Sequence, residues 1–235
     1  METVGHEHRL NLQRQSFLGA NSSDALHNTR AAIVGLGGGG SHVAEQLAHI
    51  GVGDFLLLDP DTIEDTNLNR LVGARFAAIE QKTSKVLIAK RIIESVNPQA
   101  KIVMAASDWE QQALALQDCE VIFGCVDSLI CRSELESFAR RYLIPLIDIG
   151  MDVHGSEGAY AITGQVALSM PGRACLKCVG TTTAPAFGGR STEIWQRRIE
   201  AAGHLAQCNS GFYRGWLLHA DDDALVQEGR VHTTA

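Results

Sequence analysis

The sequence predicts an α/β protein built on a doubly wound, mainly parallel sheet, and three observations carry this prediction. Short apolar runs typical of buried strands alternate with amphipathic segments typical of helices. A run of glycines stands between the first such strand and the first such helix. An aspartate closes the second strand, at the edge where open parallel sheets bind ligands.

The elements follow in order along the chain. A short helix around 22–28 precedes the sheet. Strands are predicted at 31–34, 55–58, 102–104, 121–125 and 143–149, and helices at 41–50, 83–97, 109–117 and 128–142. Residues 159–169 are expected to form an antiparallel extension. After Cys178 the pattern weakens to one helical segment at 193–202, so the C-terminal tail is poorly predicted.

This organisation divides the chain into three parts. Residues 1–29 are expected to be an N-terminal arm, 30–170 a nucleotide-binding sheet domain, and 171–235 a segment with a C-x-x-C pair, a crossover loop and a divergent tail. The chain has 235 residues, 20% of them charged, and a formal charge of −7. No basic block, signal-peptide core or long apolar run occurs, so we expect a cytoplasmic protein that binds neither nucleic acid nor membrane.

The glycine run suits a phosphate-binding loop. Glycines permit positive φ and let a phosphate approach the backbone, while the following helix directs N–H groups at the anion. The alternative is a flexible turn without a ligand. The run comprises Gly35, Leu36, Gly37, Gly38, Gly39 and Gly40.

Asp59 ends the second strand and can accept hydrogen bonds from ribose hydroxyls. Its alternative is an ordinary turn aspartate before Pro60. The glycine loop and this acid together indicate a nucleotide, but they suit NAD as well as ATP.

Polar residues after the strands favour ATP. Arg70 and Lys85 are cations suited to a phosphate chain, and Asp127 after the fourth strand suits a Mg²⁺ ligand. The cations could instead be solvated surface residues. Asp127 could instead cap helix 128–142, although Ser128 can do so too, and Arg132 could pair with Asp127 and orient it.

These residues sit in motifs that resemble the ThiF/MoeB/HesA family, which is similar to the adenylation half of ubiquitin-activating enzymes. The resemblance covers roughly 12–180. It rests on the glycine run, Leu58-Asp59-Pro60-Asp61, Asn67-Leu68-Asn69-Arg70, Lys82-Thr83-Ser84-Lys85 and Cys125-Val126-Asp127-Ser128, with Arg14-Gln15 upstream.

The resemblance implies a Rossmann-like fold and a set of roles. Asp59 would hold the ribose; Asn67, Arg70 and Lys85 would hold the β- and γ-phosphates; Asp61 would belong to the same nucleotide site. Asp127 would bind Mg²⁺, and Arg14 would reach into the site of a neighbouring subunit of a homodimer.

The implied activity is adenylation of the C-terminal carboxylate of a ubiquitin-like or sulfur-carrier protein, with release of pyrophosphate. Because a carboxylate is already a nucleophile at pH 7, such a site needs alignment and charge neutralisation rather than a general base. Two alternatives stay open: an NAD-dependent oxidoreductase, and a non-catalytic partner subunit that keeps the adenylation fold.

Cysteines after the sheet suggest a second site. Cys175 and Cys178 form a C-x-x-C pair that can hold one side of a tetrahedral Zn²⁺, with a redox or vestigial pair as the alternative. Relatives complete the site with a second C-x-x-C, which this chain lacks; His204 and Cys208 could replace it. Cys208 could instead be a nucleophile for acyl transfer.

Overall fold

The computed structural model describes residues 12–156 and 159–181, with the side chains of 152–163 left aside. The chain divides into two compact units, 1–121 and 122–235, which are described separately. None of the described helices is both long and apolar enough to cross a membrane.

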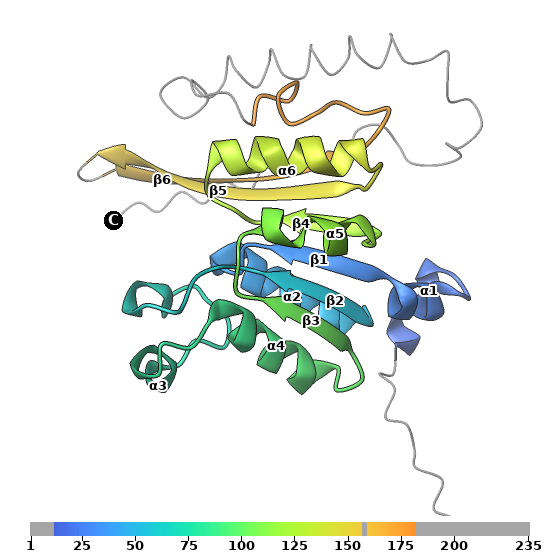
Figure 1. The fold of residues 1–235 in the computed structure, drawn as a ribbon, viewed down its shortest axis with the longest axis horizontal. Helices are drawn as coiled ribbons and strands as arrows, with labels where there is room; N and C mark the ends of the chain where they lie inside the picture. Colours follow the sequence, from blue (N-terminus) through green and yellow to red (C-terminus); the bar gives the residue numbers. More distant parts are fainter. Residues whose placement is uncertain (1–11, 157–158, 182–235) are drawn as a thin grey trace, which may run out of the picture. The chain divides into compact units, whose positions relative to one another are not determined.

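The first unit contains three parallel strands with β2 in the middle (Figure 1). Strand β1 (Arg30–Val34) pairs with β2 (Asp54–Leu58) from Arg30↔Asp54 to Val34↔Leu58, and β2 pairs with β3 (Lys101–Ala105). The strands β1 and β2 form the buried core of this unit, because their apolar runs are almost wholly inaccessible to solvent.

Helices and short turns surround these strands. The long helices are α2 (Gly38–Ile50) and α4 (Lys85–Val96), which pack against each other. The shorter elements are η1 (Gln13–Leu18), α1 (Ser22–Asn28), η2 (Asp65–Asn67), α3 (Phe76–Glu80), η3 (Trp109–Gln112) and α5 (Ala113–Gln117).

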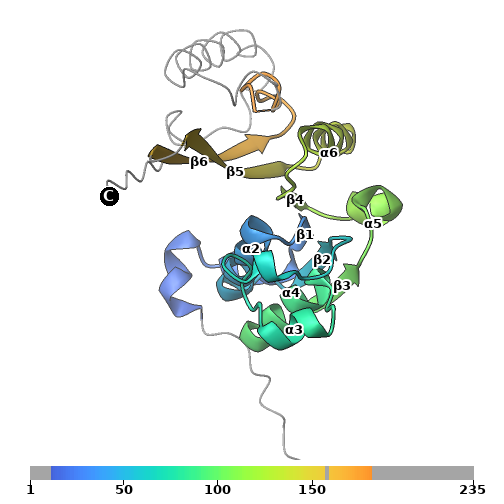
Figure 2. The same ribbon diagram turned by 90° about the vertical axis from the view of Figure 1, so that its left-hand side faces the viewer.

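The second unit consists of β4 (Val121–Gly124), which begins at the last residue of unit 1, then α6 (Leu129–Arg141), β5 (Leu146–Ser156) and β6 (Ala159–Ser169). Strand β4 pairs parallel with β5, while β5 and β6 form a long antiparallel hairpin. Helix α6 packs on β5 (Figures 1 and 2). The predicted α/β class, the mainly parallel strands and the antiparallel extension are therefore confirmed.

Several boundaries differ from the prediction. Helix 83–97 begins only at Lys85, because Ser84 forms a β-bridge with Thr62 and the Thr83 carbonyl accepts from the Ile63 N–H. The helix predicted at 109–117 is broken into η3 and α5. Strand 143–149 begins at Leu146, after Leu143 turns the chain with a φ of 59°, and continues to Ser156 because it pairs with β6. The segment at 193–202 lies outside the described residues.

Candidate functional site: a glycine loop, two cations and a separate carboxylate

The glycine loop joins β1 to α2, as the sequence predicts. Gly35 turns the chain with a φ of 86°, a conformation that glycine adopts without steric cost, and its N–H donates to the Leu58 carbonyl at 2.9 Å. Gly37 is the N-cap of α2, and a Cβ there would meet no atom of the described residues within 4 Å. The helix therefore begins beside open space at Gly37, and the N-terminus of a helix directs backbone N–H groups that can bind a phosphate.

Asp59 fastens this loop to the end of β2. Its Oδ2 accepts from the Leu36 N–H at 2.6 Å, and its Oδ1 accepts from the Asp61 N–H at 2.8 Å. The side chain is only 5% exposed. Burial raises the pKa of Asp59, against the opposing effects of these two hydrogen bonds and of Lys85. The Asp59 carboxylate thus accepts one hydrogen bond within its own turn, from Asp61, and one from the glycine loop, at Leu36.

Arg70 lies across the start of α2. A Cβ built on Gly38 would lie 3.2 Å from Arg70 Cδ, so the arginine stem covers this glycine closely. The guanidinium donates to the Thr66 carbonyl at 2.6 Å and to Asn69 Oδ1 at 3.3 Å, and the residue stays exposed. The structure therefore places a solvent-accessible cation beside the glycine loop.

The segment that carries Arg70 is held at both ends. Asn67 is buried and forms a capping box with Glu64, whose N–H donates to Asn67 Oδ1 at 3.1 Å. Ser41 on α2 accepts from the Val72 N–H through its Oγ at 3.0 Å. The role of Ser41 was not predicted, because its only signal in the sequence is a hydroxyl directly after the glycine run.

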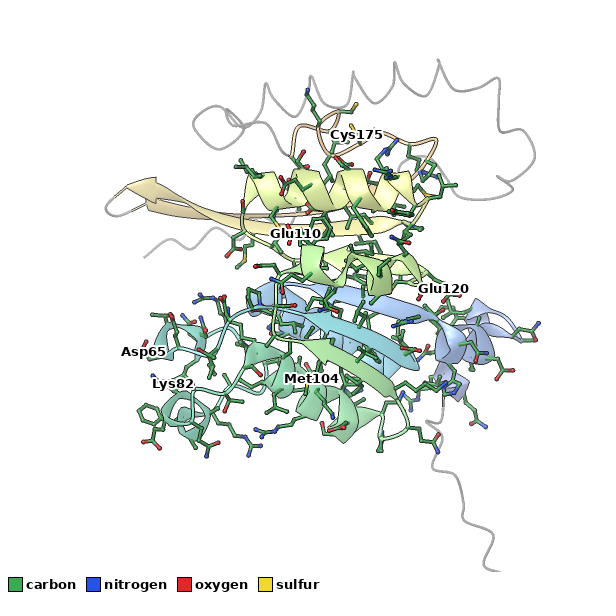
Figure 3. The ribbon with its side chains drawn as sticks, viewed as in Figure 1. Asp65, Lys82, Met104, Glu110, Glu120 and Cys175 are labelled. Atoms are coloured by element: carbon green, nitrogen blue, oxygen red, sulfur yellow. The ribbon has the colours of Figure 1, made fainter. Side chains whose placement is uncertain are left out.

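Lys85 stands at the first position of α4 and faces two carboxylates. Its Nζ lies 2.7 Å from Asp61 Oδ2 and 4.0 Å from Asp59 Oδ1. The Lys85 N–H also donates to the Asp61 carbonyl at 3.0 Å. Lys85 is therefore already paired, and a phosphate would have to compete with the exposed Asp61 for its ammonium group. Asp65 on η2 and Lys82 in the turn after α3 are labelled in Figure 3.

The first unit thus brings together the glycine loop, Asp59, Asp61, Arg70 and Lys85 at the carboxyl ends of β1 and β2. Arg14 lies apart on η1 as an exposed residue. Its predicted role in a neighbouring subunit stays a prediction.

Asp127 belongs to the second unit. It is exposed in the loop between β4 and α6, and within the described part of the chain no hydrogen bond or ion pair engages its side chain. Ser128 caps α6 by accepting from the Cys131 N–H, so the helix does not use Asp127 as its cap. An exposed, unpaired carboxylate fits a Mg²⁺ ligand in chemistry and access.

The predicted pairing of Arg132 with Asp127 is wrong. Arg132 is 6% exposed, and its Nε donates to the Val126 carbonyl at 2.8 Å. Its Nη2 donates to the Ile149 carbonyl at 3.3 Å, and Nη1 lies 3.6 Å from Asp148 Oδ2. The guanidinium points inward because β5 supplies a buried carboxylate and a carbonyl there, neither of which was visible from local spacing.

Burial raises the pKa of one acid and one thiol near Arg132. It raises the pKa of Asp148 to about 6 even though Arg132 opposes the shift. It raises the pKa of Cys125 to about 12, with a smaller contribution from Asp148. This thiol is therefore protonated and inert near neutral pH.

The C-x-x-C loop is held by α6 (Cys175 is labelled in Figure 3). The Sγ atoms of Cys175 and Cys178 lie 3.3 Å apart. Buried Glu136 accepts from the Leu176 N–H, between the two cysteines, at 2.7 Å, and from Ser169 Oγ at 2.5 Å. The role of Glu136 was not predicted, although its place four residues after Arg132 puts both on the buried face of α6.

A zinc site would need more ligands than these two. Among residues 12–156 and 159–181 no group of three or more His, Cys, Asp or Glu side chains could hold a metal ion. The described residues thus supply half of a tetrahedral set. His204 and Cys208 lie outside the described residues.

Comparisons with known proteins place the chain among related sequences. The profile of the ThiF family matches residues 9–204. Molybdopterin-synthase adenylyltransferase from Haemophilus influenzae is 32% identical over 173 residues, which cover 72% of this chain and 67% of that enzyme. Ubiquitin-like modifier-activating enzyme 5 from Dictyostelium discoideum is 30% identical over 174 residues, which cover 68% of this chain and 43% of that protein.

Among solved structures, the E. coli tRNA N6-threonylcarbamoyladenosine dehydratase TcdA is similar, with a TM-score of 0.54 and 25% sequence identity. The match covers 58% of each chain. This likeness supports the Rossmann-like class of the described residues.

Proposed function

Because the chain belongs to the ThiF family, we propose that it binds ATP with Mg²⁺ and adenylates the C-terminal carboxylate of a ubiquitin-like or sulfur-carrier protein, releasing pyrophosphate. The chain spans about two thirds of the Haemophilus enzyme and less than half of the Dictyostelium protein, so the substrate and the partner belong to the proposal.

The proposed reaction joins two substrates. The carrier carboxylate attacks the α-phosphorus of ATP, the bond to the β-phosphate oxygen breaks, and an acyl-adenylate and pyrophosphate form. The glycine loop would bind phosphate through its N–H groups, and Asp59 would hold the ribose. Arg70, Lys85 and Asn67 would bind the β- and γ-phosphates, which spread negative charge as pyrophosphate leaves. Mg²⁺ held by Asp127 would supply further charge neutralisation.

One observation carries the proposal: Arg70 covers Gly38 at the start of α2, while Lys85 stands at the same edge of the sheet. A helix N-terminus with two cations beside it suits a triphosphate. Hydride transfer to NAD requires no such pair, so the oxidoreductase alternative leaves these residues without a role.

Carrier-dependent exchange of labelled pyrophosphate into ATP tests the proposal. Arg70→Ala is expected to reduce exchange about 100-fold or more, because a charge contact made to the leaving group is lost. Arg75→Ala is the matched control, since Arg75 is an exposed arginine five residues along the same loop region. Equal activity of both variants would contradict the assignment of Arg70.

Calorimetry distinguishes the remaining alternatives. ATP binding that weakens in Arg70→Ala, and that loses its Mg²⁺ dependence in Asp127→Asn, supports the nucleotide site. NAD binding indifferent to both substitutions would favour an oxidoreductase. ATP binding without exchange on any carrier would favour a non-catalytic partner subunit.

A carboxylate attached to tRNA is a second candidate substrate, because the similar solved structure is a dehydratase of a tRNA-linked threonylcarbamoyladenosine. The exchange assay separates the two classes when it is run with a carrier protein and, separately, with tRNA.

Other parts of the proposal stay predictions made from the sequence and from its family resemblance. They are a homodimer in which Arg14 completes the partner's site, a cytoplasmic location, the domain limits at 29 and 170, and a Zn²⁺ at Cys175 and Cys178 completed from the tail. Metal analysis of the purified protein, with Cys178→Ser and Cys208→Ser as separate variants, tests the last of these. Loss of metal in the first variant only would make Cys208 a candidate nucleophile instead of a ligand.

A further inference from the structure

We propose that Arg132 is a positioning residue that holds the Asp127 loop in place for Mg²⁺ binding, acting through the backbone rather than through the Asp127 side chain. This inference rests on the proposed role of Asp127 as the metal ligand.

The contact that carries the inference is between Arg132 Nε and the Val126 carbonyl, 2.8 Å apart. Val126 directly precedes Asp127, so this hydrogen bond fixes the peptide plane that leads into the carboxylate-bearing residue. A charged donor makes the bond stronger than one between neutral groups. The Asp127 side chain itself stays exposed and available to a ligand.

A second contact ties the loop to the neighbouring strand. Arg132 Nη2 donates to the Ile149 carbonyl on β5 at 3.3 Å, and Nη1 lies 3.6 Å from the buried carboxylate of Asp148. One guanidinium therefore joins the loop after β4 to β5. Its planar fork can reach two carbonyls at once, which a lysine ammonium on a single stem does less well.

The surroundings leave the guanidinium little room to move. The Arg132 side chain is 7% exposed. A Cβ built on Gly150 would lie 2.2 Å from Arg132 Nη2, so the absence of a side chain at Gly150 accommodates the arginine. Because the guanidinium is enclosed on the β5 side, its hydrogen bond holds the Val126 carbonyl in position without a bound metal.

Preorganisation of this kind raises metal affinity, because the cost of ordering the ligand is met in the folded protein. Removing the arginine leaves the carboxylate present but less well placed. The expected effect therefore falls on Mg²⁺ rather than on the nucleotide.

The test is calorimetric titration of ATP into the full chain, in EDTA and at a series of Mg²⁺ concentrations. For Arg132→Met, the Mg²⁺ concentration at half-maximal enhancement is expected to rise about 10-fold or more, the range seen when residues supporting a metal ligand are changed. ATP binding in EDTA is expected to stay within about twofold, because its contacts lie in the first unit. Arg132→Lys is expected to give an intermediate shift, and it serves as the readout if the methionine variant does not fold.

Arg141→Met is the control on the same helix. Arg141 is an exposed arginine at the end of α6, over the ring of Tyr142, and its loss is expected to leave both titrations unchanged. Arg132 variants that weaken ATP equally in EDTA and in Mg²⁺ would show a general structural role and overturn the inference.

Asp127→Asn separates this inference from the proposal beneath it. If Asp127→Asn shifts the Mg²⁺ dependence and folded Arg132 variants do not, the positioning role is refuted while the metal ligand stands. If Asp127→Asn shifts nothing, the metal assignment fails, and the inference fails with it.

Discussion

Replacing Gly150 with alanine tests how tightly the core around Arg132 is packed. The added Cβ would lie 2.2 Å from Arg132 Nη2, 2.7 Å from Nη1 and 2.9 Å from Cζ. The backbone of Gly150 does not have a positive φ, so alanine causes no backbone strain. The end of an arginine side chain can usually move at little energetic cost, but this guanidinium is buried and contacts Val126, Ile149 and Asp148. The substitution must therefore break those contacts.

The expected cost follows from these contacts. Displacing the guanidinium breaks two hydrogen bonds from a charged donor, each contributing about 1.5–3 kcal/mol. Replacing glycine in a strand with alanine returns about 0.5–1 kcal/mol through reduced backbone entropy of the unfolded chain. The net loss in the free energy of unfolding is therefore expected to be about 2–5 kcal/mol, a large fraction of the stability of a typical domain.

Urea unfolding followed by circular dichroism measures this loss, with Gly164→Ala as the matched control. Gly164 lies on β6 one step from Gly150, and among the described atoms a Cβ there would meet only the Gly150 carbonyl, at 3.8 Å. The control is expected to be neutral or slightly stabilising. In an Arg132→Met background the cost of Gly150→Ala should nearly vanish, because the two residues share one contact. If Gly150→Ala and Gly164→Ala behaved alike, the argument for a confined guanidinium would be refuted.

Three further predictions concern other buried groups. Ser41→Ala is expected to cost about 1–3 kcal/mol in urea unfolding and to weaken ATP binding, because the Val72 N–H loses its acceptor. Raising the pH should destabilise the protein through Asp148. The pKa of this acid is about 6 in the folded protein against an ordinary 3.8, so its protonated form favours folding. The stabilisation is complete below pH 3.8 and is lost as the pH rises through 6. That contribution is about 3 kcal/mol, and Asp148→Asn should abolish it in unfolding measured between pH 4 and 7.5. Iodoacetamide at pH 8 should label exposed Cys178 well before Cys125, whose pKa is about 12, as read by peptide mass spectrometry.

Each of these has a control or a contradicting result. Ser95→Ala is the control for Ser41, because its hydroxyl donates to the carbonyl of Ile92 within the same helix, α4. Parallel pH curves for wild type and Asp148→Asn would refute the titration argument. Labelling of Cys125 at the rate of Cys178 would show that the core opens readily.

The sequence predicted those features of the site that depend on local order along the chain. The glycine loop, Asp59 and the start of α4 near Lys85 follow from strand-turn-helix spacing, because parallel strands bring their carboxyl ends to one edge. The predicted pairing of Arg132 with Asp127 was wrong because Arg132 lies on the face of α6 that packs against the sheet. There β5 supplies partners from a distant part of the chain. The length of β5 was missed for the same reason, since its second half exists only by pairing with β6.

The buried face of α6 carries charged residues whose order fixes the position of the helix along its axis. Arg132 meets two carbonyl oxygens, Glu136 meets the Leu176 N–H, and Arg140 meets the carbonyl of Met170. These residues are four apart, so sliding the helix by one turn would place a carboxylate against carbonyl oxygens and a guanidinium against an N–H. Each mismatch would leave a buried charge without a partner, at a cost of several kcal/mol. The polar residues therefore help to set the position of α6 along the sheet, in addition to the packing of buried Leu135 and Ala139.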